Sequence, residues 1–211
     1  IGFGTMNGKD GKPFKTRDGG VMRLENLIKE INEEMYRKIM ENHETDPEEA
    51  RKTAQIVGLS AIKYGDLSNQ ASKDYVFDVD RFTSFEGNTG PYILYTIVRI
   101  KSILARYQAE GGSLEGITIQ TPNSESEKAL MLALSKFNAV MENAFEELAP
   151  HKICANIYEL ANDFNHFYHE VKILSEENEE KKKGYLALLM LTRDVLESCI
   201  HVLGFTSPER M

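Results

Sequence analysis

Hydrophobic residues recur at helical spacing near the start of the chain. Between residues 22 and 42 they follow the i, i+3, i+4, i+7 pattern of an amphipathic helix, at Leu24, Leu27, Ile28, Ile31, Met35 and Ile39. A second helix is expected after Asp46, which can cap it, with Pro47 at its first position and Gly65 at its end. This part of the chain therefore predicts two consecutive helices.

The middle of the chain changes pattern twice. Residues 75–80 alternate between two sets of side chains, which predicts a short strand or extended segment. Residues 86–91 are rich in turn formers and also begin the next predicted helix, residues 91–108, which Gly111 and Gly112 end.

From Ser124 onward the chain again has a helical pattern. Ser124 and Glu127 form a capping box, and Pro150 breaks the run. The core stripe expected before the break is Leu130, Leu134, Phe137, Met141, Ala144 and Leu148. Ser175 can cap the last helix and Gly204 can follow its end. The fold class is therefore mainly α, with a helical bundle in the second part of the chain.

Composition narrows the class of protein. Twenty-five basic and 33 acidic residues give a net charge of −8, which argues against DNA as a partner and against indiscriminate binding of nucleic acid.

The two cysteines, Cys154 and Cys199, lack a CxxC spacing and are expected to be reduced, buried thiols of a cytoplasmic protein. The strongest apolar run is too short for a membrane span. His166 and His169 lack a third ligand, so no metal site is expected.

Residues 7–20 differ from the rest in charge. The segment contains four cations, Lys9, Lys12, Lys15 and Arg17, and two aspartates among closely spaced glycines, so its net charge is +2. Glycine lets a backbone approach an anion closely, and lysine supplies a mobile positive charge, so the segment suits a polyphosphate. It does not fit the Walker motif. The alternative interpretation is a solvated surface loop.

One face of the predicted helix 91–108 combines aromatic and basic residues, namely Tyr92, Tyr95, Arg99, Ser102 and Arg106. Such a face suits unstacked RNA bases and phosphates. The alternative is that the tyrosines cover the edge of the core and the arginines are solvated.

Several segments resemble one family in its own order along the chain. Residues 12–16 resemble the KMSKS signature of class I aminoacyl-tRNA synthetases, in the variant seen in arginyl-tRNA synthetases. The resemblance continues in residues 57–67, 74–78 and 85–92 and in the last residues of the chain. The family's HIGH signature is not matched. The resemblance therefore implies the C-terminal part of a synthetase, with the end of a Rossmann-type catalytic region at 1–78 and a helical anticodon-binding domain at 79–211.

What the resemblance implies is an arginine–tRNA ligase whose partners are arginine, ATP with magnesium, and tRNA(Arg). Lys12 and Lys15, with Thr16 and Arg17 as weaker assignments, would contact the ATP phosphates in the full enzyme. The fragment alone would need no cofactor, would be inactive, and would be a monomer. The residues implied in anticodon binding are Glu86, Asn88, Tyr92, Tyr95, Arg99, Tyr158 and Met211, with Phe167 as a further stacking candidate. Tyr158 and Phe167 are equally compatible with the core, where aromatic residues at helical spacing usually lie.

Two other interpretations stay open at this point. The bundle resembles the anticodon domain of other class I synthetases, such as the cysteinyl enzyme. An acidic helical scaffold that binds a protein partner would also explain the bundle, although it would not explain the glycine–lysine segment.

Overall fold

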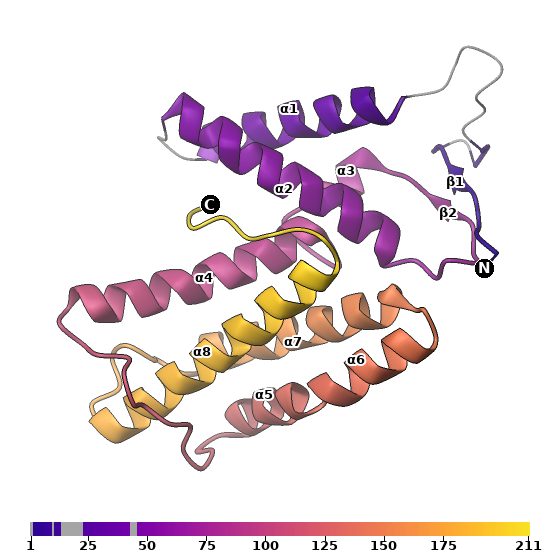
Figure 1. The fold of residues 1–211 in the computed structure, drawn as a ribbon. Helices are drawn as coiled ribbons and strands as arrows, with labels where there is room; N and C mark the ends of the chain where they lie inside the picture. The colour runs from indigo at the N-terminus through magenta and orange to yellow at the C-terminus, as the bar shows by residue number, and fades with distance from the viewer. Residues whose placement is uncertain (1, 10, 14–22, 43–45) are drawn as a thin grey trace.

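The computed structural model describes residues 2–9, 11–13, 23–42 and 46–211. Most of them are helical, as predicted (Figure 1). The elements in chain order are β1 (Met6–Asn7), α1 (Leu24–Asn42), α2 (Pro47–Leu67), β2 (Tyr75–Val76), α3 (Val79–Phe82), α4 (Gly90–Ala109), α5 (Glu125–Ser135), α6 (Phe137–Glu146), α7 (Pro150–Glu170) and α8 (Glu179–Val202).

Helices α1 and α2 form an antiparallel pair (Figure 1). The stripe of α1 that faces α2 is Leu27, Ile31, Met35 and Ile39, all buried as predicted. On α2 the facing residues include small ones, Ala50, Ala54 and Ala61, which allow two helices to approach closely. Leu24 and Ile28 were predicted in the same stripe but are exposed, because they lie at its edge near the start of the helix. Asp46 caps α2 as expected, accepting hydrogen bonds from Glu48 and Glu49.

The predicted strand at 75–80 is right only for its first two residues. Tyr75–Val76 pairs in parallel with Met6–Asn7. At Asp78 the side chain accepts hydrogen bonds from the backbone N–H groups of Asp80 and Arg81, which starts the short helix α3. An aspartate at this position favours a helix start over a longer strand.

The second part of the chain is a bundle in which α4 packs on α8 and α7, and α7 also packs on α5 and α6 (Figure 1). The run predicted from Ser124 to Pro150 is two helices, α5 and α6, because the chain turns at Lys136. Ser124 caps α5 as predicted. Leu148 was predicted in the core but is 59% exposed, since its backbone has a positive φ of 51° that turns the side chain outward.

The last helix begins and ends at residues with identifiable caps. Asn178, not the predicted Ser175, caps α8 by accepting a hydrogen bond from the backbone N–H of Lys181. Beyond its end, Gly204 has a positive φ of 84°, as expected for a residue after a C-cap. The backbone N–H of Phe205 donates to the carbonyl of Ile200, which completes a Schellman motif. This turn sends the C-terminal tail back towards α4 and α2 (Figure 1).

The two parts of the molecule meet where α4 begins. A Cβ atom at Gly90 would lie 2.3 Å from the carbonyl oxygen of Ser60 on α2, so only glycine allows this contact. Gly65 of α2 is likewise covered by the ring of Phe82. The loop before α4 is therefore pressed against α2, and its position depends on both parts.

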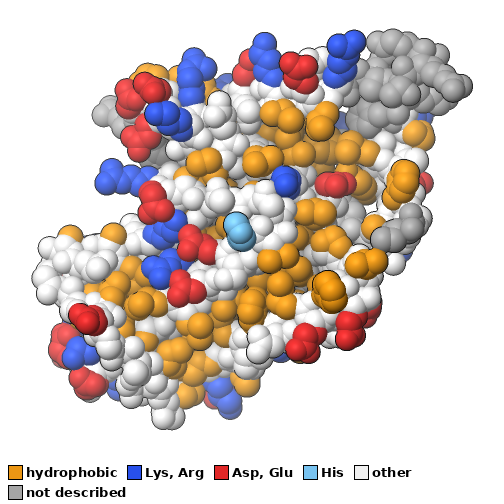
Figure 2. All heavy atoms as spheres, in the orientation of Figure 1, with side chains coloured by type: hydrophobic (Ala, Val, Ile, Leu, Met, Phe, Trp, Pro, Cys, Tyr) orange, Lys and Arg blue, Asp and Glu red, His pale blue; other side chains and the backbone are white. Residues whose placement is uncertain are grey.

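Charged side chains are spread around the molecule. On the face that Figure 2 shows, basic and acidic side chains alternate between hydrophobic areas, and neither sign forms a large block. None of the helices in the described ranges has the length and apolar composition that crossing a membrane requires. Both cysteines are buried free thiols, and burial raises the pKa of each to about 12.

Candidate nucleic-acid interface

The aromatic and basic face of α4 lies against α7, where three polar residues recur at intervals of three. The hydroxyl of Tyr92 donates a hydrogen bond to Oδ1 of Asn162 at 2.8 Å and accepts one from Nδ2 of Asn165 at 2.9 Å. Nη1 of Arg99 donates to Oδ1 of Asn165 at 2.6 Å. Because Asn165 bonds to both Tyr92 and Arg99, it joins two of the predicted residues into one network.

Arg99 is held between two tyrosine rings. Its guanidinium carbon lies 4.7 Å from the ring centre of Tyr95 and 5.0 Å from that of Tyr168, which are cation–π distances. Nη2 of Arg99 also donates to the hydroxyl of Tyr95 at 3.0 Å. Within the described ranges, Arg99 forms no ion pair with a carboxylate. Its positive charge is therefore oriented by neutral groups and is not neutralised by them.

The two tyrosines that flank Arg99 are open to solvent. Tyr95 is 40% exposed and Tyr168 is 37% exposed, so both offer ring surface for a flat ligand. Tyr92 is half-buried, and burial raises the pKa of its hydroxyl although the hydrogen bond from Asn165 opposes the shift. We call these residues, Tyr92, Tyr95, Arg99, Asn162, Asn165 and Tyr168, the α4/α7 face.

Three further residues that were considered for this face lie elsewhere or have other contacts. Tyr158 packs edge-to-face on Tyr92, with ring centres 5.8 Å apart, and so lies behind the face. For Phe167 both a stacking role and a place in the core were open, and the structure decides for the core, because the side chain is fully buried and packs on Tyr185. Arg106 is exposed two turns beyond Arg99 and pairs with Glu110.

The loop before α4 presents Glu86 and Asn88, which are both exposed. The hydroxyl of Tyr64 lies 2.6 Å from Oδ1 of Asn88 and 2.9 Å from the carbonyl oxygen of Cys154 on α7. Tyr64 is fully buried on α2, and burial raises the pKa of its hydroxyl well above the ordinary value. A neutral phenol inside the molecule therefore holds the exposed Asn88.

The same loop is closed at the helix start by Thr89. Its hydroxyl donates to the carbonyl oxygen of Ser84 at 2.6 Å and accepts from the backbone N–H of Tyr92 at 3.2 Å. Thr89 therefore links the conformation of the loop to the first turn of α4. Together with Tyr64, it makes the position of Asn88 relative to Tyr92 a fixed property of the fold.

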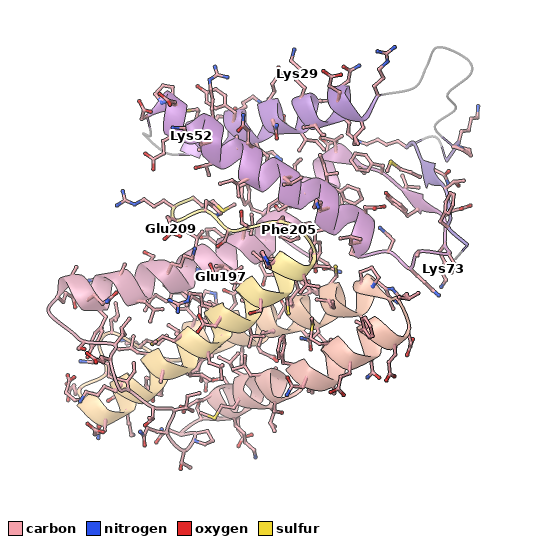
Figure 3. The ribbon with its side chains drawn as sticks, in the orientation of Figure 1. Lys29, Lys52, Lys73, Glu197, Phe205 and Glu209 are labelled. Carbon is pink, nitrogen blue, oxygen red and sulfur yellow. The ribbon has the colours of Figure 1, made fainter. Side chains whose placement is uncertain are left out.

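Met211 is partly buried against the hydrophobic core at the end of the C-terminal tail. The tail is fixed to α4 and α8 by Lys101, whose ammonium contacts Glu197 and Glu209. Figure 3 shows Glu197 and Glu209 on neighbouring segments beside α4, with Phe205 where the tail leaves α8. The tail thus reaches α4 from a different side from α7.

The glycine–lysine segment is described only in part. Lys15, Thr16 and Arg17 lie outside the described residues. Lys12 is exposed, on a turn closed by a hydrogen bond from the backbone N–H of Gly8 to the carbonyl oxygen of Lys12. Lys9 lies 3.1 Å from a carboxylate oxygen of Asp78 and 2.7 Å from one of Asp80, and these contacts raise its pKa.

A groove lies beside this segment, between β1 and the start of α1. Its volume is about 880 Å³, and it is lined by both apolar and charged side chains, among them Phe3, Leu27, Phe77, Glu30, Glu34 and Lys9. Phe3 and Leu24 at its edge are among the most exposed hydrophobic residues.

His166 and His169 on α7 are exposed, and no cluster of metal ligands occurs among the residues that the structure describes.

Four contributors to this geometry were missed by the sequence analysis, namely Tyr64, Asn162, Asn165 and Tyr168. The spacing of the last three, at i, i+3 and i+6, places them on one side of a helix and was visible in the sequence. Tyr64 carried no such signal, because a tyrosine within a helix is equally compatible with the core.

Comparisons with known proteins agree with this organisation. The family described as the catalytic domain of class I (R) tRNA synthetases matches residues 1–79, and the DALR anticodon binding domain matches residues 93–211. Arginine–tRNA ligases from Agathobacter rectalis and Alkaliphilus oremlandii are 66% and 58% identical over the whole chain. The chain spans 37% and 36% of the length of these two relatives.

Solved structures show the same fold. The arginyl-tRNA synthetase of Thermus thermophilus superposes with a TM-score of 0.82 at 25% identity, over 99% of this chain and 35% of that one. The corresponding Plasmodium falciparum structure gives a TM-score of 0.79 at 31% identity, over 90% of this chain and 34% of that one.

The fold and the two matched regions thus define a class I aminoacyl-tRNA synthetase module with a helical anticodon-binding domain. The chain belongs to the arginyl-tRNA synthetase family. The match to the class I (R) catalytic-domain family at residues 1–79 favours this family over that of the cysteinyl enzyme. The domain boundary predicted between residues 78 and 79 stays a prediction.

Proposed function

We propose that the α4/α7 face binds the anticodon loop of tRNA(Arg), as part of an arginine–tRNA ligase that forms arginyl-tRNA with ATP. The observation that carries the proposal is Arg99, an arginine oriented by Tyr95, Tyr168 and Asn165 that pairs with no carboxylate of the described part of the chain. Arginines that already have acidic partners must lose them to bind phosphate. Arg99 needs no such exchange, so its fixed charge favours an RNA ligand.

Each predicted residue has a distinct role in this proposal. Tyr95 offers an exposed ring to an unstacked base, and Arg99 offers its charge to a phosphate or its plane to a base. Glu86 and Asn88 present polar groups from the neighbouring loop. Tyr158 supports Tyr92 from behind. Met211 contributes from the C-terminal tail. Tyr168, which the structure adds to this set, forms the second ring beside Arg99.

The test is binding of an anticodon stem-loop of tRNA(Arg) to the 211-residue chain at fixed salt concentration. Replacing Arg99 with alanine should weaken binding roughly tenfold or more, since it removes a charge and two stacking contacts. Arg51→Ala is the matched control, because Arg51 also lies over a tyrosine ring, that of Tyr36, but outside this face. Equal affinities of both variants would contradict the proposal.

We also propose that Lys12 and Lys15, with Thr16 and Arg17, contact ATP in the complete ligase. Lys12 fits this role, because it is exposed on a glycine turn where Gly11 has a φ of +73°. Magnesium bound to ATP would neutralise part of the phosphate charge, and the lysines would stabilise the pyrophosphate that leaves. Lys9 fits less well, since it already pairs with Asp78 and Asp80.

The chain by itself should catalyse no exchange between ATP and pyrophosphate in the presence of arginine. The reason is that it offers no match to the HIGH signature, and it spans little more than a third of its relatives. Exchange is measured for the unmodified chain and for Lys15→Ala. A rate for the unmodified chain above that of the variant would overturn this expectation.

A further inference from the structure

Lys101, on the side of α4 away from the α4/α7 face, is a largely buried lysine with three oxygen partners. Its side chain is only 15% exposed, and its ammonium lies 2.9 Å from Oε1 of Glu197 and 2.8 Å from Oε1 of Glu209. It also donates to the hydroxyl of Ser207 at 3.0 Å, and Ser207 donates in turn to Glu197 at 2.8 Å. The three donors of one ammonium are thus matched by three oxygens, two of them on the C-terminal tail.

Lys101 supplies the positive charge that holds the two carboxylates of this cluster together. Burial alone would lower the pKa of Lys101, but the hydrogen bonds to Glu209 and Glu197 outweigh burial and raise it, so the ammonium is charged. Without that charge, Glu197 of α8 and Glu209 of the tail would face each other as like charges. The cluster would then repel the tail from α8 instead of holding it.

Lys101 is not itself placed to join the α4/α7 face. It follows Tyr92 by nine positions on a helix, which at about 100° per residue puts the two on opposite sides of α4. Lys101 binds the tail at Ser207 and Glu209, and Phe205 is buried where the tail leaves α8. From Glu209 the chain has only two residues to its end, so Met211 can move at most about 7 Å from that anchor.

We propose that Lys101 is a positioning residue, which anchors the C-terminal tail to α4 and α8 and so fixes where Met211 lies. This inference rests on the proposed function, in which Met211 takes part in binding. Figure 3 shows that Glu209 and Glu197 lie beside α4. The cluster therefore limits where the end of the chain can lie relative to α4 and α8.

A double-mutant cycle on the 211-residue chain tests this role, with the anticodon stem-loop of tRNA(Arg) as the probe. Lys101→Met and Met211→Ala should each lower affinity about threefold to tenfold. The double variant should bind no more weakly than Met211→Ala, because Lys101 acts only through the tail. Lys101→Arg should restore most of the affinity, since a guanidinium can also bind two carboxylates.

Lys182→Met is the matched control. Lys182 is also 15% exposed and pairs with a carboxylate, Glu179, but it lies at the other end of α8 from the tail. This control should bind the stem-loop as the unmodified chain does. Thermal unfolding of each variant separates a loss of affinity from a loss of folding.

The possible outcomes separate this inference from the proposed function. If binding depends on Arg99 but Lys101→Met has no effect, or has its full effect in the Met211→Ala chain, the role of Lys101 is refuted and the function stands. If the unmodified chain does not bind the stem-loop, both are refuted.

Discussion

Arg99 lies in the α4/α7 face and Lys9 in the glycine–lysine segment, and the fold holds these two cations in opposite ways. Arg99 is half-buried among neutral groups, two tyrosine rings and the amide of Asn165. Lys9 is exposed and bonded to two carboxylates, those of Asp78 and Asp80. The first arrangement costs desolvation but keeps the positive charge available to a ligand. The second stabilises a turn and uses the charge within the chain.

The difference teaches where the binding site is preorganised. Two of the three partners of Arg99, Asn165 and Tyr168, come from α7, more than sixty residues along the chain, so its orientation depends on the packed core of the bundle. The partners of Lys9 are Asp78, just before α3, and Asp80, in its first turn, both at the surface. Changes that loosen the core should therefore affect the α4/α7 face strongly and the Lys9 turn little.

The largest effect is expected at Phe164, which is fully buried on α7 and stacks on Tyr168. Phe164→Ala should lower the free energy of unfolding by about 3–5 kcal/mol, because it leaves a cavity beneath the α4/α7 face. Chemical denaturation measures the change. Phe145→Ala is the control, since Phe145 is 81% exposed and should change stability by less than about 0.5 kcal/mol. Similar losses of unfolding free energy for both variants would contradict the role of Phe164 as a core residue that supports the α4/α7 face.

A smaller effect is expected from Tyr64→Phe, which removes one hydroxyl and keeps the ring. The hydroxyl contacts Asn88 and the carbonyl oxygen of Cys154, so stability should fall by about 1 kcal/mol. Affinity for the anticodon stem-loop should fall several-fold, because Asn88 loses its support. The control is Tyr75→Phe, which removes a hydrogen bond to Asp66, outside the face. A loss of affinity as large in this control would remove Tyr64 from the interface.

The smallest effect is expected from Lys9→Ala. Its ion pairs are solvent-exposed and screened by water, so stability at neutral pH should fall only slightly. Burial works to raise the pKa of Asp78, but the contact with Lys9 and the backbone hydrogen bonds from Arg81 and Asp80 together outweigh it, so the net pKa is lowered. The pair therefore stabilises the fold fully above the ordinary pKa of aspartate, about 3.9, and less as the pH falls through the lowered value. Denaturation at pH 7 and at about pH 3 checks this: a difference that persists in acid would point to another cause.

Most helices could be predicted from the pattern of apolar residues, and the errors occurred where two local signals competed. Ser175 and Asn178 are both good capping residues, and local sequence does not distinguish them. At Asp78 a helix start competed with a strand, and the capping hydrogen bonds of the aspartate decided for the helix. The apolar residues keep helical spacing up to Leu148, but helix α6 ends at Glu146 and the backbone of Leu148 has a positive φ.

The candidate site was predictable on α4 and not on α7. Tyr92, Tyr95 and Arg99 share a helix face, so their proximity follows from the helical repeat alone. Asn165 and Tyr168 meet them only through the packing of α4 on α7, which the helical repeat does not encode. For Phe167 the helical spacing left a stacking role and a place in the core open, and only the packing of the bundle decided for the core.

Local sequence was enough to decide the helices, their apolar faces and the partition of charge, because these depend on spacing over a few residues. Tertiary structure alone decided which side chains complete the site. It brought Asn165 and Tyr168 to Arg99, Tyr64 to Asn88, and Lys101 to the C-terminal tail. Each of these contacts joins segments far apart in the chain, and their geometry is set by how the helices fill the core together.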